Sequence, residues 1–361
     1  MKRIKVVIVV PSLVTGGAEN VVCQLSKALN KECVQIKVIC LSVKKNTSFE
    51  HDLLNSGIDV IYLNNNGKLS LKTMMLLWRF LSKYKPDIIH THLHASLYAF
   101  PWVYTHKVLL LHTIHSTPKF EFSSRIIQLM NKLYKSNKAV PVAISDKIRL
   151  ETAKLYSLPI NRIELIYNPV NINRFKKTET KANNGIKFIH VARLDPQKNQ
   201  SLLIKAFAIV KKEKADASLV IVGDGELRKE LKALVHSLNL EDCVTFTGNI
   251  PNVEHYLHDA DIFVLSSTNE GLPLSILEAM AAGLPIISTK VGGIEDIIVG
   301  NGILVESGDI QAISNAMLKL SNDNHLRNKM AMASLLQANK YDISIVAKEY
   351  ERLYHRYSLH A

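Results

Sequence analysis

The amino-acid sequence predicts an α/β protein built from two doubly wound parallel sheets. Short apolar runs alternate with longer helical stretches along the chain, which is typical of parallel strands joined by crossover helices. The 361 residues suffice for two domains of ordinary size, and 47% of them are hydrophobic, as in a soluble globular protein. A polar segment at 168–184, rich in Asn, Lys and Thr, is the expected seam between the domains.

The predicted strands form two sets. In the first half of the chain they lie near residues 5–10, 35–41, 59–63, 87–92, 107–114 and 139–144. In the second half they recur near residues 187–191, 218–222, 244–247, 262–266, 285–288 and 302–305. We therefore expect one domain over 1–170 and a second over 171–341. The last segment, 342–361, holds an apolar-periodic helix that we expect to cross back onto the first domain, by analogy with other two-domain proteins of this kind.

Cysteine usage and hydropathy exclude several classes of protein. The four cysteines form no CxxC pair and no metal-ligand spacing, which predicts reduced thiols in a cytoplasmic protein. The start MKRIKVVIVV imitates a signal peptide, but Pro11 and Gly16-Gly17 follow at once, so a first buried strand is expected instead. No stretch approaches the ~20 apolar residues of a membrane span.

The net charge of +13 lies entirely in the first half of the chain. Residues 1–170 carry 23 Lys and Arg against 10 Asp and Glu, whereas residues 171–361 carry 22 of each. If the excess charge only reflected a lysine-rich proteome, both halves of the chain would carry it equally. We therefore favour an anionic partner, either a membrane surface or an acceptor. The helical stretch 125–138 sets apolar residues against Arg125, Lys132, Lys135 and Lys138, and is either a membrane-surface helix or a plain surface helix. Core packing is favoured for the apolar stretch 69–84.

The stretch EGLPLSILEAMAAGLPIIST, from Glu270 to Thr289, carries the strongest functional signal. Glu270 follows a buried strand, and a helix is expected from Pro273, in its first turn, through Glu278 to Gly283. The N–H groups of Leu274, Ser275 and Ile276 are then free to bind phosphate. Two carboxylates beside an anion-binding helix start suit a ligand that has both phosphates and hydroxyls, such as a sugar nucleotide.

Two further loops offer groups suited to a diphosphate. Arg193 and Lys198 follow the first strand of the second half, where they either bind a diphosphate or lie in a solvated loop. The glycines Gly16-Gly17 after the first strand either admit a ligand to a helix start or make an ordinary tight turn. The string GDGELR at 223–228 lacks the third glycine of a dinucleotide fingerprint, so nicotinamide chemistry is poorly supported.

The histidines and one acidic pair are candidates for metal ligands or reaction groups. His115 ends a predicted strand and is either a sugar-orienting group or a loop histidine. His90, His92 and His94 alternate along a segment expected to be extended, but no cysteine or acid completes a metal site. The D-x-D at 259–261 lies between a helix and a buried strand, which favours a structural turn. We expect no metal site.

Eight motifs in chain order match one family. They are GGAEN, TIHS at Thr113–Ser116, AIS at Ala143–Ser145, IYNPVNINRF at Ile166–Phe175, VARLDPQKN, VIVGDGELR, VTFTGNI and E-x7-E from Glu270 to Glu278. On these motifs the chain resembles the retaining, metal-independent glycosyltransferases of family 4, which have two facing Rossmann-like domains (the GT-B fold). One departure is Asn168-Pro169-Val170, where many relatives have Asn-Gly-Val.

The resemblance implies a role for each candidate residue. The implied catalytic residues are His115, Arg193, Lys198 and Glu270. The implied donor-binding residues are Gly16, Gly17, Arg193, Lys198, Gly223, Asn249, Ile250, Glu270, Leu274, Ser275 and Glu278. Within this set the two cations hold the diphosphate, Glu270 contacts the transferred sugar, and Glu278 accepts from the ribose. His115 lies near the reacting face of the sugar, and the backbone at 248–250 meets the base.

The expected function is transfer of a hexose or N-acetylhexosamine from a UDP- or GDP-linked sugar to a glycan or lipid-linked glycan in cell-surface polysaccharide synthesis. No cofactor and no metal ion are expected, and the protein is expected at the inner face of the cell membrane. The alternatives are a sugar-nucleotide epimerase or sugar phosphorylase of the same fold, and a non-catalytic binding protein. Nucleic acid is not an expected partner, because no RNA-binding motif accompanies the charge.

Overall fold

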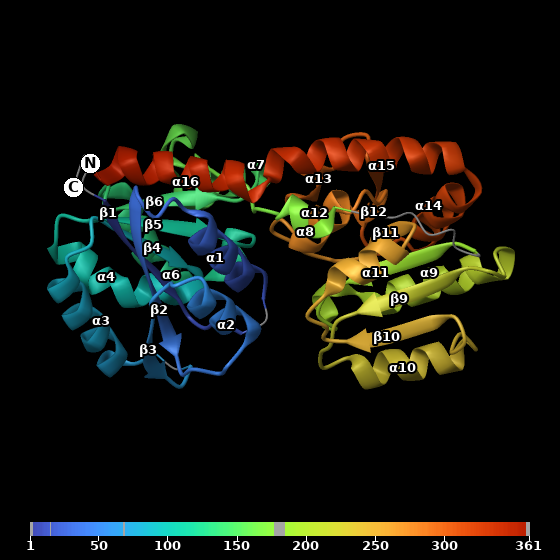
Figure 1. The fold of residues 1–361 in the computed structure, drawn as a ribbon, viewed down its shortest axis with the longest axis horizontal. Helices are drawn as coiled ribbons and strands as arrows, with labels where there is room; N and C mark the ends of the chain where they lie inside the picture. The colour runs from blue at the N-terminus through green and yellow to red at the C-terminus, as the bar shows by residue number, and fades with distance from the viewer. Residues whose placement is uncertain (1–2, 15, 68, 177–184, 359–361) are drawn as a thin grey trace. The chain divides into compact units, whose positions relative to one another are not determined.

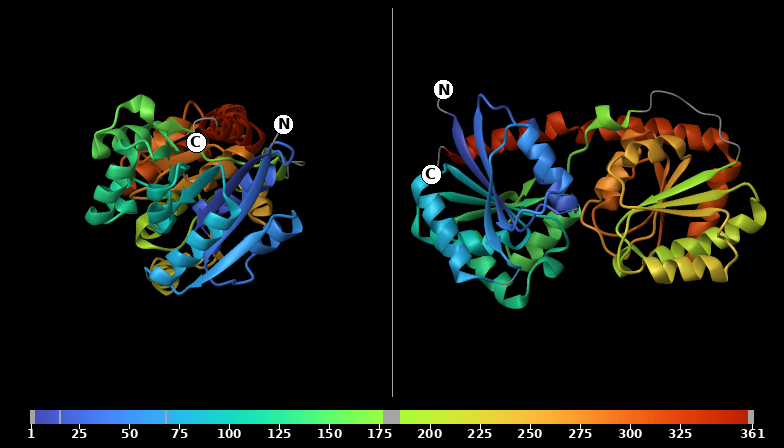
Figure 2. Two further views of the ribbon diagram at one scale, coloured as in Figure 1. Left: turned by 90° about the vertical axis from the view of Figure 1, so that its left-hand side faces the viewer. Right: turned by 60° about the horizontal axis from the view of Figure 1, so that its bottom comes forward.

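The computed structural model describes residues 3–14, 16–67, 69–176 and 185–358. The chain divides into two compact units (Figure 1). The first unit is Met1–Pro169 together with Ile343–Ala361, and the second is Val170–Asp342. In both units helices cover the two faces of a central sheet (Figure 2), as parallel sheets require when both faces are buried.

The first unit contains a parallel sheet with the strand order β3-β2-β1-β4-β5-β6-β7 in its described part. The strands are β1 Ile4–Val10, β2 Val34–Ser42, β3 Val60–Asn65, β4 Ile88–His92, β5 Leu109–Ile114, β6 Ala139–Ala143 and β7 Glu164–Leu165. The helices are α1 Gly17–Ala28, α2 Ser48–Asn55, α3 Leu71–Tyr84, α4 Ser96–Thr105, α5 Pro118–Glu121, α6 Ser124–Lys135, α7 Asp146–Tyr156 and α16 Ile343–Ser358, with 3-10 turns η1 Leu93–Ala95 and η2 Ile160–Arg162.

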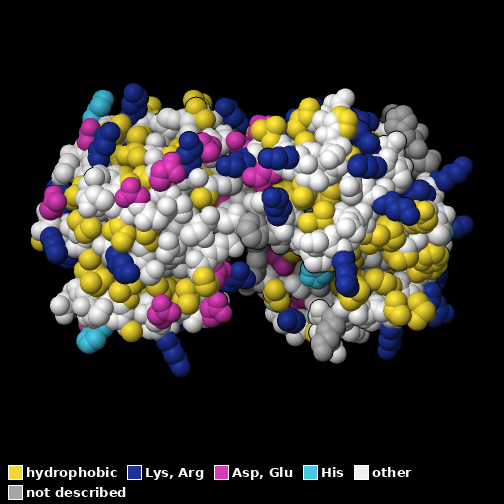
Figure 3. Space-filling model, turned by 180° about the vertical axis from the view of Figure 1, so that it is seen from behind, with side chains coloured by type: hydrophobic (Ala, Val, Ile, Leu, Met, Phe, Trp, Pro, Cys, Tyr) yellow, Lys and Arg dark blue, Asp and Glu magenta, His cyan; other side chains and the backbone are white. Residues whose placement is uncertain are grey.

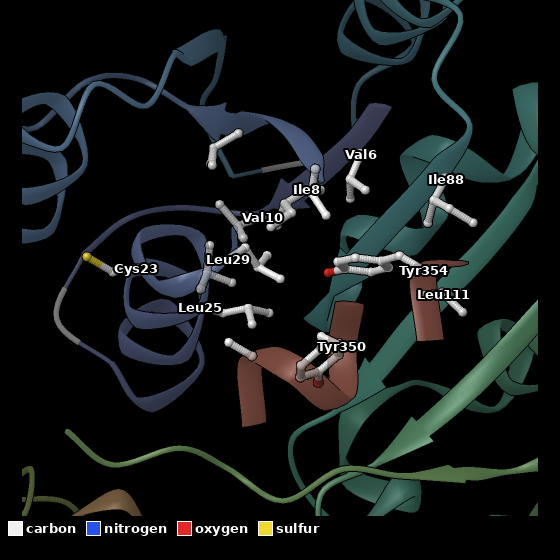
Figure 4. Close-up of a cluster of buried hydrophobic side chains, with 14 of the residues drawn as sticks. Val6, Ile8, Val10, Cys23, Leu25, Leu29, Ile88, Leu111, Tyr350 and Tyr354 are labelled. Carbon is white, nitrogen blue, oxygen red and sulfur yellow. The ribbon is translucent and has the colours of Figure 1, made fainter. Parts of the chain in front are cut away.

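The C-terminal helix α16 completes the core of this unit. Val346, Ala347, Tyr350, Leu353 and Tyr354 are buried with residues of β1, β2, β4 and α1. Figure 4 shows the rings of Tyr350 and Tyr354 among apolar side chains of β1, α1 and β4. The last helix of the sequence therefore belongs to the fold of the first unit.

The second unit repeats the architecture, with the strand order β10-β9-β8-β11-β12-β13, and its named strands pair in parallel. The strands are β8 Lys187–Val191, β9 Ser218–Val222, β10 Val244–Gly248, β11 Ile262–Leu265, β12 Ile286–Thr289 and β13 Gly302–Val305. The helices are α8 Ile172–Phe175, α9 Gln200–Glu213, α10 Arg228–Ser237, α11 Val253–Asp259, α12 Leu274–Ala281, α13 Ile294–Ile297, α14 Ile310–Asn322 and α15 Asn324–Ala338, with 3-10 turns η3 Pro196–Lys198 and η4 Asn339–Tyr341. The prediction of two doubly wound parallel sheets is confirmed.

Two helices of the first unit differ from expectation. Core packing is predicted for the apolar stretch at 69–84, yet α3 buries only Thr73, Leu77 and Leu81. Its Leu71, Met75 and Leu76 side chains are 78%, 61% and 38% exposed. One helical face packs on the sheet, and this sequence has more apolar residues than that face holds.

The predicted basic face at 125–138 is shorter than expected. Helix α6 ends at Lys135, and Lys138 lies beyond it. The Lys138 ammonium donates to the carbonyl oxygens of Tyr104, at 2.9 Å, and His106, at 3.3 Å, at the end of α4. Lys138 therefore caps a neighbouring helix end, where a positive charge is favourable. Arg125, Lys132 and Lys135 remain as the exposed cations of the expected set.

Among the described residues, no helix combines the length and the apolar character that are needed to cross a membrane.

Candidate functional site

The centre of the candidate site is an ion pair between Lys198 and Glu270. Lys198 ends the η3 turn after β8, and Glu270 follows β11. These two strands are parallel neighbours, so their carboxyl ends lie at the same sheet edge. The Lys198 Nζ atom lies 2.7 Å from Glu270 Oε1, and the Ser267 hydroxyl donates to the same oxygen at 2.6 Å. Glu270 is only 5% exposed, so the lysine and the hydroxyl compensate its buried charge.

Asp195 organises the two cations of the β8 loop. Its Oδ2 atom lies 2.6 Å from Arg193 Nε, and its Oδ1 accepts the Lys198 backbone N–H at 3.2 Å as the N-cap of η3. The Arg193 side chain is 72% exposed, whereas Asp195 is buried. Sequence reasoning did not single out Asp195. The available signal was its position before Pro196, since Asp then Pro is a typical start of a helical turn.

A glycine pair after β12 fixes the loop of Glu270. Gly292 has φ +57°, and a Cβ there would collide with the Glu270 carbonyl oxygen. The Gly293 N–H donates to Gly271 O at 2.7 Å. Sequence reasoning missed this pair, although Gly-Gly after a strand is a signal for close backbone approach.

Helix α12 begins beside this loop at Leu274, with Pro273 as N-cap and no side chain capping its first turn. Two details of the prediction were wrong. Pro273 precedes the helix and has a non-helical ψ of 123°, and the Ile276 N–H donates to Pro273 O at 3.2 Å. Leu274 and Ser275 remain the candidate amide donors. Leu274 is buried and Ser275 is half-buried.

Glu278 lies one helical turn after Leu274 and is half-buried. Burial raises the pKa of its carboxyl to about 7, against the opposing effect of the nearby Arg174 guanidinium and with the help of Glu254. Arg174 pairs with Glu254 at 3.0 Å and donates to Pro251 O at 3.0 Å. At neutral pH Glu278 is therefore present in both its ionised and its neutral form.

Gly223 and the segment after β10 come together at the end of β9. The Gly223 N–H donates to Gly248 O at 3.0 Å, and Asn249 and Ile250 follow directly. Gly223 has φ +128°, and a Cβ there would collide with the Ala192 carbonyl oxygen. Close packing of two loops thus already requires glycine here. Asn249 is exposed and Ile250 is half-buried.

Gly16, Gly17 and His115 lie in the first unit, whereas the other candidates lie in the second. Helix α1 begins at Gly17, and a Cβ on Gly17 would meet no atom within 4 Å. Gly16 has extended backbone, and a Cβ there would meet the Glu19 carboxylate. His115 follows β5, and its Nε2 atom lies 2.8 Å from Nδ1 of His92.

The candidate metal ligands of the sequence analysis are not arranged as a metal site. Strand β4 ends at His92, and His94 lies in the η1 turn, so the three histidines do not share one extended face as was expected. The Asp261 carboxylate accepts the Lys187 N–H at 2.8 Å, which confirms a structural role. Within the described part of the chain, no three His, Cys, Asp or Glu side chains gather as a metal-ligand group.

Two family models match the chain. Residues 171–335 match the model described as Glycosyl transferases group 1, and residues 15–174 match Glycosyltransferase Family 4. The chain is similar to the UDP-Gal:α-D-GlcNAc-diphosphoundecaprenol α-1,3-galactosyltransferase of Escherichia coli, with 29% identity over 343 residues and 85% of each chain covered. It is also similar to the N-acetyl-α-D-glucosaminyl L-malate synthase of Bacillus anthracis, with 30% identity over 287 residues and 74% of each chain covered.

Solved structures share the architecture. The Anabaena protein HepE in complex with UDP superposes with a TM-score of 0.84 at 20% identity, covering 98% of this chain and 100% of HepE. A glycosyltransferase from Rickettsia africae gives a TM-score of 0.86 at 20% identity, covering 99% of both chains. At this identity the likeness shows a common fold.

Proposed function

The chain belongs to the family 4 glycosyltransferases with the two-domain GT-B fold, and on that premise we propose that it is a retaining, metal-independent enzyme. Its proposed reaction moves a hexose or N-acetylhexosamine from a nucleotide-diphosphate sugar to a lipid-linked glycan. The observation that carries the proposal is the Lys198–Glu270 pair, which sets a cation and a hydroxyl acceptor side by side at the carboxyl edge of the second sheet.

In the proposed site, positive charge and backbone amides bind the diphosphate of the nucleotide sugar. Arg193 and Lys198 neutralise the diphosphate, and the uncapped amides of Leu274 and Ser275 add donors. As the bond from the sugar to the diphosphate breaks, negative charge grows on the leaving phosphate, and these groups stabilise it. Each well-placed donor contributes about 3 kcal/mol to such a step. The acceptor hydroxyl attacks from the face that the phosphate leaves and passes its proton to the departing phosphate oxygen, which balances the step and gives retention.

The remaining candidates are assigned to the sugar and the nucleoside. Glu270 accepts hydroxyls of the transferred sugar, and Glu278 accepts those of the ribose. The backbone at Asn249 and Ile250 is assigned to the base. In the first unit, His115 is assigned to the transferred sugar and the Gly17 N–H to the diphosphate. The open space over Gly17 supports a ligand at the start of α1.

The relatives support the choice of substrates. The name of the E. coli relative gives UDP-galactose as donor and a diphosphoundecaprenol-linked sugar as acceptor. A Campylobacter jejuni relative with 25% identity over 364 residues, covering 97% of this chain and 98% of its own, is named as acting on a saccharide linked to PP-undecaprenol. HepE has been crystallised with UDP-glucose. We therefore propose a UDP-sugar ahead of a GDP-sugar as donor.

With a polyprenyl-linked acceptor, the proposed enzyme acts at the inner face of the cell membrane. It is then a cytoplasmic protein that binds this membrane peripherally. Two features of the first unit support this location: the exposed apolar side chains of α3 and the exposed cations of α6. Figure 3 shows hydrophobic side chains beside Lys and Arg on the first unit, at the right of that view. Apolar contact together with cationic charge is the combination that binds anionic membranes.

A thermal-shift panel of UDP- and GDP-linked sugars tests this function. A ligand that binds only the folded state raises the melting temperature, by an amount that grows with its concentration over Kd. We expect at least one UDP-sugar to raise it, and we expect Lys198→Ala to lose most of that shift. As the matched control, Lys205→Ala removes an exposed cation from α9 of the same unit and should keep the shift. If no nucleotide sugar stabilises the protein, the proposed function is wrong.

A further inference from the structure

A buried row of histidines behind His115 is not used by the function proposed above. His90 and His92 alternate on β4, and their ring centroids lie 4.3 Å apart. His92 is fully buried, and its ring lies 5.1 Å from that of His115. Burial, together with the neighbouring histidines, lowers the pKa of His92 well below its usual value and that of His115 to about 3. Both rings are therefore neutral near pH 7, and each has one N–H and one lone pair.

Each ring nitrogen of His90 has a hydrogen-bond partner. Its Nδ1 atom lies 2.8 Å from the Tyr354 hydroxyl of α16, and its Nε2 atom lies 2.7 Å from the Thr113 hydroxyl. Both ring nitrogens of His90 are thus occupied. His92 Nδ1 lies 2.8 Å from His115 Nε2, whereas His92 Nε2 is buried without a partner among the described residues.

The unpartnered atom decides which way the hydrogen bond between His92 and His115 runs. If His115 donated through Nε2, the hydrogen of His92 would lie on its Nε2 atom as a buried N–H without an acceptor, which is rare in proteins. If His92 donates through Nδ1, only a lone pair is left unpartnered. The second arrangement places the hydrogen of His115 on Nδ1.

We propose that His92 is a positioning residue that holds His115 in its Nδ1–H form, so that His115 serves as a hydrogen-bond donor to an oxygen of the bound sugar. No group in the described residues accepts from His115 Nδ1, so this N–H is left for a ligand. The inference rests on the proposed function for the identity of that ligand. The tautomer itself follows from the contacts within the first unit.

Nuclear magnetic resonance of the full-length protein labelled with ¹⁵N-histidine tests the tautomer directly. Two-bond ¹H–¹⁵N correlations identify the protonated nitrogen of each neutral ring, and His115→Gln assigns the His115 signals by their loss. We expect His115 to carry its hydrogen on Nδ1 in the free protein. A hydrogen on Nε2 overturns the proposal, even if the enzyme transfers sugar as proposed.

Two variants of His92 separate positioning from packing. His92→Leu removes the donor, and His92→Asn keeps an N–H near the place of Nδ1. We expect His92→Leu to move the His115 hydrogen to Nε2 and to lower kcat roughly 10- to 100-fold, the range typical of lost orienting hydrogen bonds, with a nearly unchanged donor KM. His92→Asn should keep the Nδ1–H form and recover most of kcat. Equal losses in both variants, or an unchanged tautomer in His92→Leu, would refute the positioning role. If no donor or acceptor supports transfer while the spectra agree, the proposed function fails and the tautomer stands.

Discussion

The Glu278 carboxyl of the candidate site changes its charge near neutral pH. Burial raises its pKa from 4.5 to about 7. The folded state therefore binds this proton more tightly than the unfolded chain does. The resulting contribution to stability is fully present below pH 4.5 and is lost as the pH rises through 7. If ribose hydroxyls donate hydrogen bonds to this carboxylate, the affinity for the nucleotide sugar changes in the opposite direction and rises with pH.

We expect the affinity for a UDP-sugar to rise between pH 6 and pH 8. Well below a pKa of about 7 the ionised fraction of Glu278 falls tenfold per pH unit, which sets the limiting slope. Titration calorimetry across this range measures the effect, and the diphosphate of a UDP-sugar does not itself titrate there. Glu278→Gln should bind more weakly and independently of pH. A wild-type affinity that is flat from pH 6 to pH 8 would contradict the role of Glu278.

Gly292 and Gly300 offer a matched pair of glycines in the second unit. Both have positive φ, +57° and +75°, but only at Gly292 would a Cβ collide with backbone, at the Glu270 carbonyl. Strain from positive φ alone costs about 1 kcal/mol for alanine. We therefore expect Gly300→Ala to lose about that much stability, and Gly292→Ala to lose more and also to weaken donor binding. Chemical denaturation and calorimetry of both variants check this, and equal effects would remove Gly292 from the site.

At the scale of elements, helix α16 ties the end of the chain to the histidine row of the first unit. Tyr354 meets His90 Nδ1 at 2.8 Å, and the Tyr350 hydroxyl lies 3.2 Å from that of Thr113. All four groups are buried. Because a buried polar atom without a partner costs about 1–3 kcal/mol, this helix stabilises the unit by polar contacts as well as by apolar packing.

We expect Tyr354→Phe to lower the melting temperature of the protein clearly, because it leaves His90 Nδ1 buried without a partner. Tyr357→Phe is the control on the same helix, since its hydroxyl meets Glu164 at 2.8 Å in a partly exposed position. The melting temperature of Tyr357→Phe should fall less, because water can replace the contact with Glu164. Calorimetric melting of both variants measures the difference. A control variant as unstable as Tyr354→Phe would show that the buried hydrogen bond contributes little.

Elements with a strong local pattern were predictable from the sequence. Strands such as β8 and β9 are buried parallel strands, so they appear as continuous apolar runs, and their bounds were predicted as found. Strand β7, at Glu164–Leu165, was missed because two residues carry no periodicity. In the site, Lys198 and Glu270 were each predicted, but their direct pairing depends on the order of strands that are far apart in sequence. Asp195 and Ser267 contact residues only two or three positions away, and Gly292 contacts the distant Glu270 carbonyl. None of the three was predicted, and the sequence suggests His92 only as a metal ligand.

At the scale of the whole molecule, the excess charge belongs to the first half of the chain, and the donor-binding candidates lie mainly in the second unit. We expect the protein to co-sediment with anionic vesicles at low salt and to be released as salt rises, since attraction between exposed charges is screened. Each surface cation contributes about 1 kcal/mol to such binding. Arg125→Gln with Lys135→Gln should therefore weaken the binding roughly 30-fold, a factor of ten for each 1.4 kcal/mol.

The matched control is Lys205→Gln with Lys229→Gln, which removes the same charge from exposed positions of the second unit. It should bind vesicles nearly as well as the wild type. Binding that does not change from low to high salt, or that falls equally in both double variants, would contradict a membrane-facing first unit.

We propose that Lys198, Arg193 and helix amides bind the diphosphate without a divalent ion. One measurement tests this proposal most directly. The measurement is the initial rate of sugar transfer from the UDP-sugar found in the thermal-shift panel, with and without excess chelator, for wild type, Lys198→Ala and Lys205→Ala. We predict rates for wild type and Lys205→Ala that the chelator leaves unchanged, and a Lys198→Ala rate at least 100-fold lower, as when a transition-state donor is removed. Loss of wild-type transfer in the chelator, or full activity of Lys198→Ala, would contradict it.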